Sequence, residues 1–127
     1  MTIYYTSEQV KGRYITEMGE PLGALYYGLY SEVVWLHNIW HEYVELFGAK
    51  ASRVDLLNRA APSFFRLTHD LMWEGTLLQI VRLTDFPKRG EQGRLTLCAL
   101  PKLVDQDVRQ AVEKAVEKAL RNVRGGF

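Results

Sequence analysis

Apolar side chains recur every three or four residues along most of the chain, which is the period of an α-helix. The longest such run comprises Leu22, Leu25, Leu29, Val33, Leu36, Trp40, Tyr43 and Phe47. A second apolar row flanks this one, so the helix is expected to have neighbours on more than one side. The pattern predicts a long central helix of a bundle.

A second long helical pattern follows after residue 51. Its apolar or small positions are Val54, Leu57, Ala61, Phe64, Phe65, Thr68, Leu71, Met72, Gly75, Leu78 and Val81. Pro62 lies inside this pattern, and a proline removes a backbone donor and clashes with the preceding turn. We therefore expect a kink or short break near Pro62. Thr68 and Gly75 are small enough to let another helix approach closely.

Shorter patterns complete the prediction. A helix is expected over residues 7–18, followed by a boundary at 19–21, and another over residues 105–123. The inward stripe expected on this last helix is Val108, Ala111, Val112, Ala115 and Ala119. Residues 85–93 predict a loop, and residues 95–100 predict a short helix or irregular turn capped by Thr96. The sequence thus predicts an all-α bundle of about four to five helices, as a single domain over residues 1–127.

Composition supports a globular protein. The 127 residues are 47% hydrophobic and 24% charged, which excludes disordered and fibrous classes. The net charge of +1 gives no global basic field of the kind that marks many nucleic-acid binders. It hides an asymmetry, because residues 1–48 carry −4 and the remainder +5. The two halves could attract each other within a bundle or between two copies, although ordinary solvated helix faces explain the pattern too.

The sequence contains no feature that directs the protein to a membrane or out of the cell. A single cysteine, Cys98, cannot form an intramolecular disulfide. The first residues show no secretory signal pattern, and the apolar region 22–47 carries acidic residues and histidines that are costly in a bilayer. We expect a cytoplasmic protein that does not contact a membrane.

His37 and His41 stand four residues apart, with Glu45 one turn further on. This is the spacing of helical zinc ligands, but the general-base glutamate of H-E-x-x-H is missing. A core-edge histidine and an exposed helix pair explain these residues more simply. No metal and no cofactor are expected.

Arg66, His69 and Asp70 form the other cluster of acid, base and cation. Adjacent residues on a helix point in different directions, and no serine or cysteine nucleophile stands beside them. A solvated helix face is the preferred interpretation.

A third group, Arg82, Thr84 and Asp85, ends the second long helix. Arg82 and Asp85 are spaced for an ion pair, and Thr84 or Asp85 could close the helix end by local hydrogen bonds. The simplest interpretation is a structural stop.

Several short segments together carry a family resemblance. They are the Trp40-x-x-Tyr43-x-x-Leu46-Phe47-Gly48 segment, Leu56-Leu57-Asn58 with Phe64-Phe65, Leu77-Leu78-x-x-x-Arg82-Leu83-Thr84-Asp85, and Leu95-Thr96-Leu97. Over about residues 20–120 the chain resembles the AbiU-type HEPN family of prokaryotic abortive-infection-like proteins. The resemblance implies an all-α bundle, a homodimer and, in active members, metal-independent ribonuclease chemistry in phage defence or toxin–antitoxin systems.

Ribonucleases of this kind carry Arg-x(4–6)-His, in which arginine stabilises the phosphate and histidine transfers a proton. None of the three histidines has an arginine at the required distance before it. Arg121-Asn122 stands where the motif could begin, but no histidine follows. Either the catalytic end is missing from a truncated or frameshifted chain, or Arg121-Asn122 is coincidence.

Two functions follow from these observations. The preferred one is a non-catalytic helical domain that acts by dimerisation or partner binding, with RNA or a cognate antitoxin as candidate partners. The alternative is a ribonuclease with a missing or degenerate motif, in which His69 acts with Arg66 or Arg82.

Overall fold

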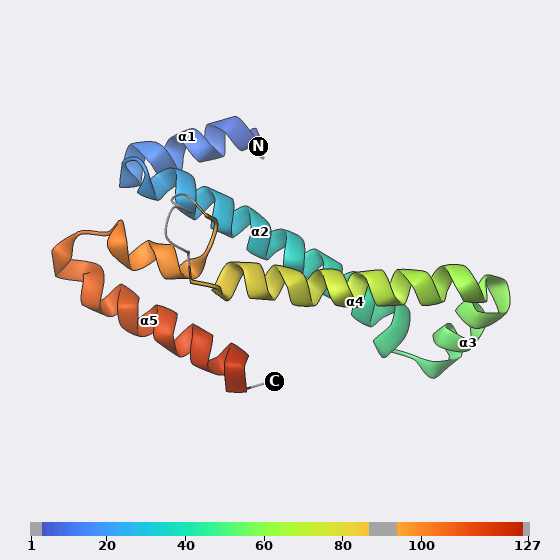
Figure 1. Ribbon diagram of the computed structural model, residues 1–127. Coiled ribbons are helices and arrows are strands. Elements are labelled where there is room, and N and C mark those ends of the chain that lie inside the picture. The colour runs from blue at the N-terminus through green and yellow to red at the C-terminus, as the bar shows by residue number, and fades with distance from the viewer. Residues whose placement is uncertain (1–3, 87–93, 126–127) are drawn as a thin grey trace. The chain divides into compact units, whose positions relative to one another are not determined.

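The computed structural model describes residues 4–86 and 94–125 (Figure 1). Its α-helices are α1 (Ser7–Met18), α2 (Leu22–Tyr43), α3 (Ala51–Ala60), α4 (Pro62–Thr84) and α5 (Gln106–Gly125). A π-helical turn, η1 (Val44–Gly48), and a 3₁₀ helix, η2 (Leu97–Lys102), complete the order. No strand occurs in the described ranges, which confirms the all-α prediction. Most of the loop predicted over residues 85–93 lies outside the described residues.

The chain divides into two compact units. We call residues 1–31 with 82–127 the terminal unit, and residues 32–81 the hairpin unit. The unit boundaries fall within α2 and near the end of α4. None of the described helices is long and apolar enough to cross a membrane.

Close helix packing characterises the terminal unit. A capping box between Thr6 and Gln9 starts α1, and Gly19, with a φ of 77°, ends it. Gly23 then brings α2 against α1, because a Cβ at this position would lie 2.5 Å from the carbonyl oxygen of Tyr14. The aromatic rings of Tyr14 and Tyr26 meet edge to face at 5.1 Å between centroids.

The helices η2 and α5 pack against each other within the same unit (Figure 1). Thr96 caps η2, as the sequence predicted, by accepting a hydrogen bond from the backbone N–H of Cys98. The inward stripe predicted for α5 is partly wrong, because the less exposed row is Val112, Val116, Leu120 and Val123, whereas Val108, Ala111, Ala115 and Ala119 are exposed. Larger apolar side chains remove more area from water than alanine does, so they take the inner face.

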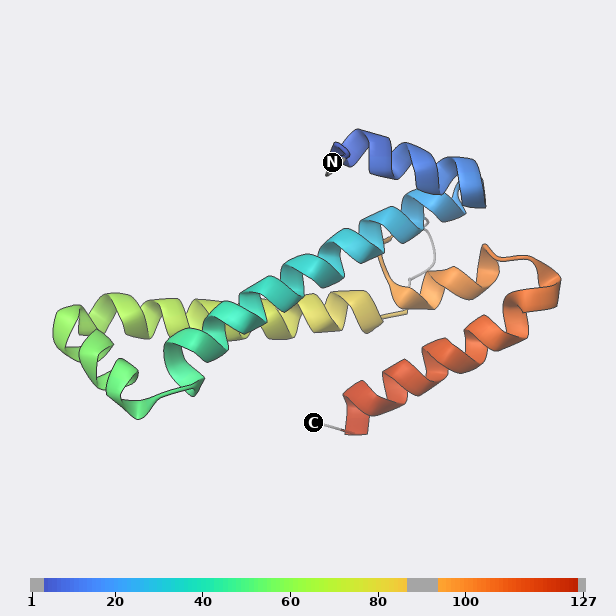
Figure 2. The same ribbon diagram turned by 180° about the vertical axis from the view of Figure 1, so that it is seen from behind.

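The hairpin unit consists of the second part of α2, η1, α3 and most of α4. Figures 1 and 2 show the second part of α2 crossing α4, and the order of the contacts between them makes the two helices antiparallel. Gln79 donates a hydrogen bond to Glu32 near one end, and Trp40 lies 6.3 Å from Trp73 between ring centroids. Arg53 of α3 joins this helix to η1 through the Glu45 carboxylate at 3.0 Å.

The structure contains the break predicted near Pro62. Helix α3 ends at Ala60, Ala61 has an extended φ of −158°, and Pro62 is the first residue of α4. Proline is tolerated in a first helical turn because its missing N–H would have no partner there. The predicted second long helix is therefore two helices.

The face that α4 turns outward differs from the prediction. Phe64, Leu67, Leu71, Leu78 and Val81 are between 53% and 64% exposed, whereas Phe65, Met72 and Thr76 are more buried. Paired apolar residues such as Phe64-Phe65 and Leu71-Met72 give α4 two apolar faces, so periodicity alone could not select the buried one. We call Phe64, Leu67, Leu71, Leu78 and Val81 the outer row of α4.

Candidate functional site

The hairpin unit brings Tyr43, His69 and Asp70 together. The Tyr43 hydroxyl lies 2.9 Å from Nε2 of His69, and Nδ1 of His69 lies 3.0 Å from a carboxylate oxygen of Asp70. The two histidine nitrogens are therefore both occupied. His69 and Asp70 keep 41% and 59% of their side chains exposed, so water reaches the group.

This chain of hydrogen bonds fixes the orientation of the imidazole. A charged Asp70 carboxylate accepts from Nδ1–H, which leaves Nε2 to accept the Tyr43 O–H. The arrangement has the order carboxylate, imidazole, hydroxyl that supports proton transfer from a hydroxyl group. It holds the His69 ring with a hydrogen bond at each nitrogen.

Aromatic rings surround this group. Phe47 meets the His69 ring edge to face at 5.0 Å, and Tyr43 lies 5.4 Å from Trp40 and 5.8 Å from Trp73 between centroids. Such ring contacts fix side-chain positions on both helices. The π-helical turn after Tyr43 places Phe47 against His69.

One sequence expectation is wrong here. Adjacent residues on α4 were expected to point apart, but Nδ1 of His69 and a carboxylate oxygen of Asp70 share a hydrogen bond. Arg66 is exposed, and both ring nitrogens of His69 bond to other residues. Tyr43 is the partner that spacing could not reveal, because 26 residues separate it from His69.

The other candidates are dispersed. His37 and His41 are exposed on α2, and the described residues contain no group of three or more metal-ligating side chains. Arg121 and Asn122 are exposed near the end of α5. Cys98 is partly buried, and its thiol donates to the carbonyl of Thr84 at 3.6 Å.

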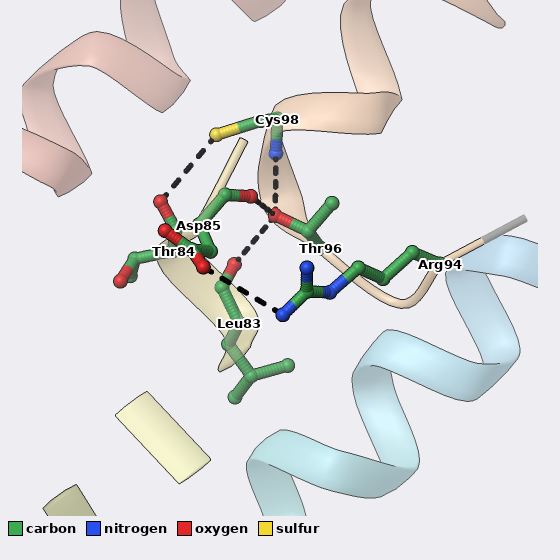
Figure 3. Close-up of polar contacts among 6 residues, drawn as sticks. All are labelled: Leu83, Thr84, Asp85, Arg94, Thr96 and Cys98. Carbon is green, nitrogen blue, oxygen red and sulfur yellow. Dashed lines mark hydrogen bonds and ion pairs between the residues drawn. The ribbon is translucent and has the colours of Figure 1, made fainter. Parts of the chain in front are cut away.

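Residues further along the chain form hydrogen bonds to the carbonyl groups at the end of α4 (Figure 3). The hydroxyl of Thr96, fully buried, donates to the carbonyl oxygens of Leu83 at 3.1 Å and Asp85 at 2.6 Å. The last carbonyl groups of a helix have no hydrogen-bond donor within the helix. Here the donor is the hydroxyl of Thr96, which lies 11 residues or more further along the chain. At this end of α4 the carbonyls of Leu83, Thr84 and Asp85 therefore accept hydrogen bonds from Thr96 and Cys98.

The carboxylate of Asp85 has a partner other than the predicted Arg82. It pairs with Arg94, whose guanidinium nitrogen lies 3.6 Å from a carboxylate oxygen. Figure 3 draws this ion pair. Arg94 comes from the segment that leads into Thr96, so this pair strengthens the same connection. Local spacing favoured Arg82, but the returning segment places Arg94 at the carboxylate.

Comparisons with known proteins assign the family. The described fold is all-α, as the sequence predicted. A HEPN family model with the description AbiU2 matches residues 19–126, which is most of the chain. Searches of curated proteins and of solved structures found no match.

The chain therefore belongs to the AbiU2 family of HEPN domains, which confirms the resemblance drawn from the sequence. This membership indicates a defence-type function related to abortive infection.

Proposed function

We propose that the chain is a non-catalytic helical module of a phage-defence or toxin–antitoxin system, and that it acts as a homodimer. Family membership supports the defence role. The absence of any Arg-x(4–6)-His pair from the sequence supports a role without catalysis. RNA and a cognate antitoxin remain candidate partners from the resemblance.

The main support for the proposed dimer is the exposure of the outer row of α4. Its five large apolar side chains are more than half exposed and follow one face of a helix for about five turns. Large apolar side chains gathered on one exposed face mark an interaction site more often than a solvated face. Its steps of 3, 4, 7 and 3 residues fit the helical period of helices packed against each other, and the position within the step of 7, Glu74, is not apolar.

A second copy is the occupant that this face fits. A hairpin of two helices buries only one side of each helix, and pairing two hairpins gives a four-helix arrangement in which the outer rows become a core. Twofold association also needs a patch that is complementary to itself. The outer row offers leucines near both ends and at its middle, which meets that requirement.

Light scattering on Leu71→Asp tests this proposal. A charge in the middle of the outer row weakens the dimer about a hundredfold or more, because association must desolvate the carboxylate. Leu56→Asp is the matched control, since Leu56 is 56% exposed in the same unit but lies on α3. A wild-type chain that stays monomeric at micromolar concentration, or equal effects of both variants, contradicts the proposal.

The hydrogen-bond chain of Tyr43, His69 and Asp70 favours one alternative function. In that alternative the chain is a ribonuclease in which His69 moves the proton. Arg66, one turn before His69, is the nearest cation along α4.

Expression with a growth and RNA-integrity readout separates the two functions. Our proposal expects no growth arrest that depends on His69. The ribonuclease alternative expects arrest and RNA cleavage that His69→Ala abolishes and His37→Ala preserves, because His37 is an exposed histidine outside the hydrogen-bond chain. Cleavage lost in His69→Ala alone would replace the proposal by the alternative.

A further inference from the structure

The spacing along the outer face of α4 is symmetric. Glu74 lies on the same face, between Leu71 and Leu78 of the outer row. With Glu74 included, the positions on this face are Phe64, Leu67, Leu71, Glu74, Leu78 and Val81, and the steps between them are 3, 4, 3, 4 and 3 residues. These steps are the same from either end. A second copy laid along this face in the opposite direction therefore meets every position of the row with another position of the row.

We propose that two copies pair antiparallel along this face and that Glu74 keeps their affinity low. This inference rests on the proposed homodimer and specifies its geometry and its limiting residue. In this register Phe64 lies opposite the second copy's Val81, and Leu67 opposite its Leu78. Leu71 lies opposite its Glu74.

Glu74 is the single charged residue among the six positions. A polar residue at one core position of paired helices selects register and partner number at a cost in stability. In a parallel pair the two Glu74 carboxylates would face each other in the same layer, where like charges repel most. In the antiparallel pair each faces a leucine, and the two positions are offset by about 4.5 Å along the helix axis, the rise of three residues.

Gly75 provides a second, independent observation. It lies inside α4, where glycine costs about 1 kcal/mol relative to alanine. Nothing in the described chain lies within 4 Å of the place a Cβ would occupy, so no contact of the monomer requires a glycine here. In the antiparallel register Gly75 comes beside the second copy's Thr68. Two small side chains at this point let the helix axes approach closely.

Cross-linking determines the direction of pairing. We would introduce Leu67→Cys and Leu78→Cys separately, each with Cys98→Ser, and treat single and mixed preparations with a short bismaleimide. If the pairing is antiparallel, a cross-linked dimer forms only when the Leu67→Cys and Leu78→Cys chains are mixed. In a dimer of Leu67→Cys chains the two thiols are about 16 Å apart along the axis, 11 residues at 1.5 Å each, which exceeds the cross-linker. Cross-linking within a single preparation, or none in any, overturns the antiparallel register.

Sedimentation of Glu74→Leu tests the limiting residue. Replacing the carboxylate by leucine is expected to tighten the dimer about tenfold or more. Glu42→Leu is the matched control, because Glu42 is an exposed glutamate of the same unit on α2. If Leu71→Asp dissociates the dimer but Glu74→Leu does not tighten it, the role of Glu74 is wrong and the homodimer stands. If Leu71→Asp has no effect, the proposed homodimer itself fails.

Discussion

The two units of the chain differ in where their large apolar side chains lie. In the described residues, the buried apolar side chains are Leu25, Leu29, Leu83 and Leu120, and all four belong to the terminal unit. The buried residue of the hairpin unit is a threonine, Thr76, whose hydroxyl donates to the carbonyl of Met72. Both units expose single large apolar residues, such as Phe86 in the terminal unit and Trp35 in the hairpin unit, but the hairpin unit also exposes the outer row of α4.

This difference separates two kinds of stabilisation. The terminal unit obtains its stability from contacts within one chain, including a glycine packed on backbone and a buried threonine. The hairpin unit leaves apolar area in water, and covering that area is worth about 25 cal/mol per Å². Substitutions in the terminal unit should therefore change the free energy of unfolding, whereas those on the outer row should change association.

Gly23→Ala should have the largest effect on folding. The added Cβ would lie 2.5 Å from the carbonyl oxygen and 2.6 Å from the Cα of neighbouring residues on α1, and backbone cannot move aside as a side chain can. We expect a loss of about 3 kcal/mol in the free energy of unfolding in urea. Gly28→Ala is the comparison, because its Cβ would meet only the side-chain end of Leu95. Equal losses would contradict the close approach of α1 and α2.

Thr96→Val should follow in size. The substitution keeps the shape of the buried side chain but removes the hydroxyl that holds the carbonyls at the end of α4. Leaving those groups without a partner costs about 2 kcal/mol. Thr16→Val is the control, since the Thr16 hydroxyl bonds to a carbonyl of its own exposed helix. The connection between α4 and η2 is not stabilising if urea unfolding gives the same midpoint for both variants.

Sequence patterns predicted which segments are helical better than which faces are buried. The periods of α2 and the position of Pro62 gave the helices and the break, because both are local effects. The buried face of α4 was missed because it includes Thr76, while Leu67, Leu71 and Leu78 are exposed. A prediction based on hydrophobicity alone cannot choose between two such faces.

The candidate site shows the same limit. Spacing identified His69 and Asp70 on one helix, but not that Tyr43 hydrogen-bonds to His69 across the hairpin. Asp85 likewise forms an ion pair with Arg94, nine residues later in the sequence, instead of the predicted pair with Arg82. Both Tyr43 and Arg94 reach their partners because the chain folds back on itself. A single sequence carries no signal for such contacts. The family, by contrast, was accessible from short helical segments.

Tyr43→Phe should have a smaller effect, confined to the hairpin unit. It removes the hydroxyl from Nε2 of His69 but keeps the ring among Trp40, Phe47 and Trp73. We expect a loss of about 1 kcal/mol in the free energy of unfolding. Tyr30→Phe is the control, because Tyr30 is 52% exposed. The hydrogen bond contributes nothing if the two variants unfold at the same urea concentration.

Two glycines make the finest comparison between the units. Gly12 in α1 and Gly75 in α4 both lie inside helices, and no neighbouring atom lies within 4 Å of the place a Cβ would occupy. Alanine at either site should raise the free energy of unfolding of the monomer by about 0.5–1 kcal/mol, because it restricts the unfolded chain and favours the helix. The two variants should differ in sedimentation, where Gly75→Ala weakens the dimer and Gly12→Ala leaves it unchanged. If Gly75→Ala stabilises the monomer and the dimer alike, the helices do not approach closely at Gly75, and the outer row pairs elsewhere along its length.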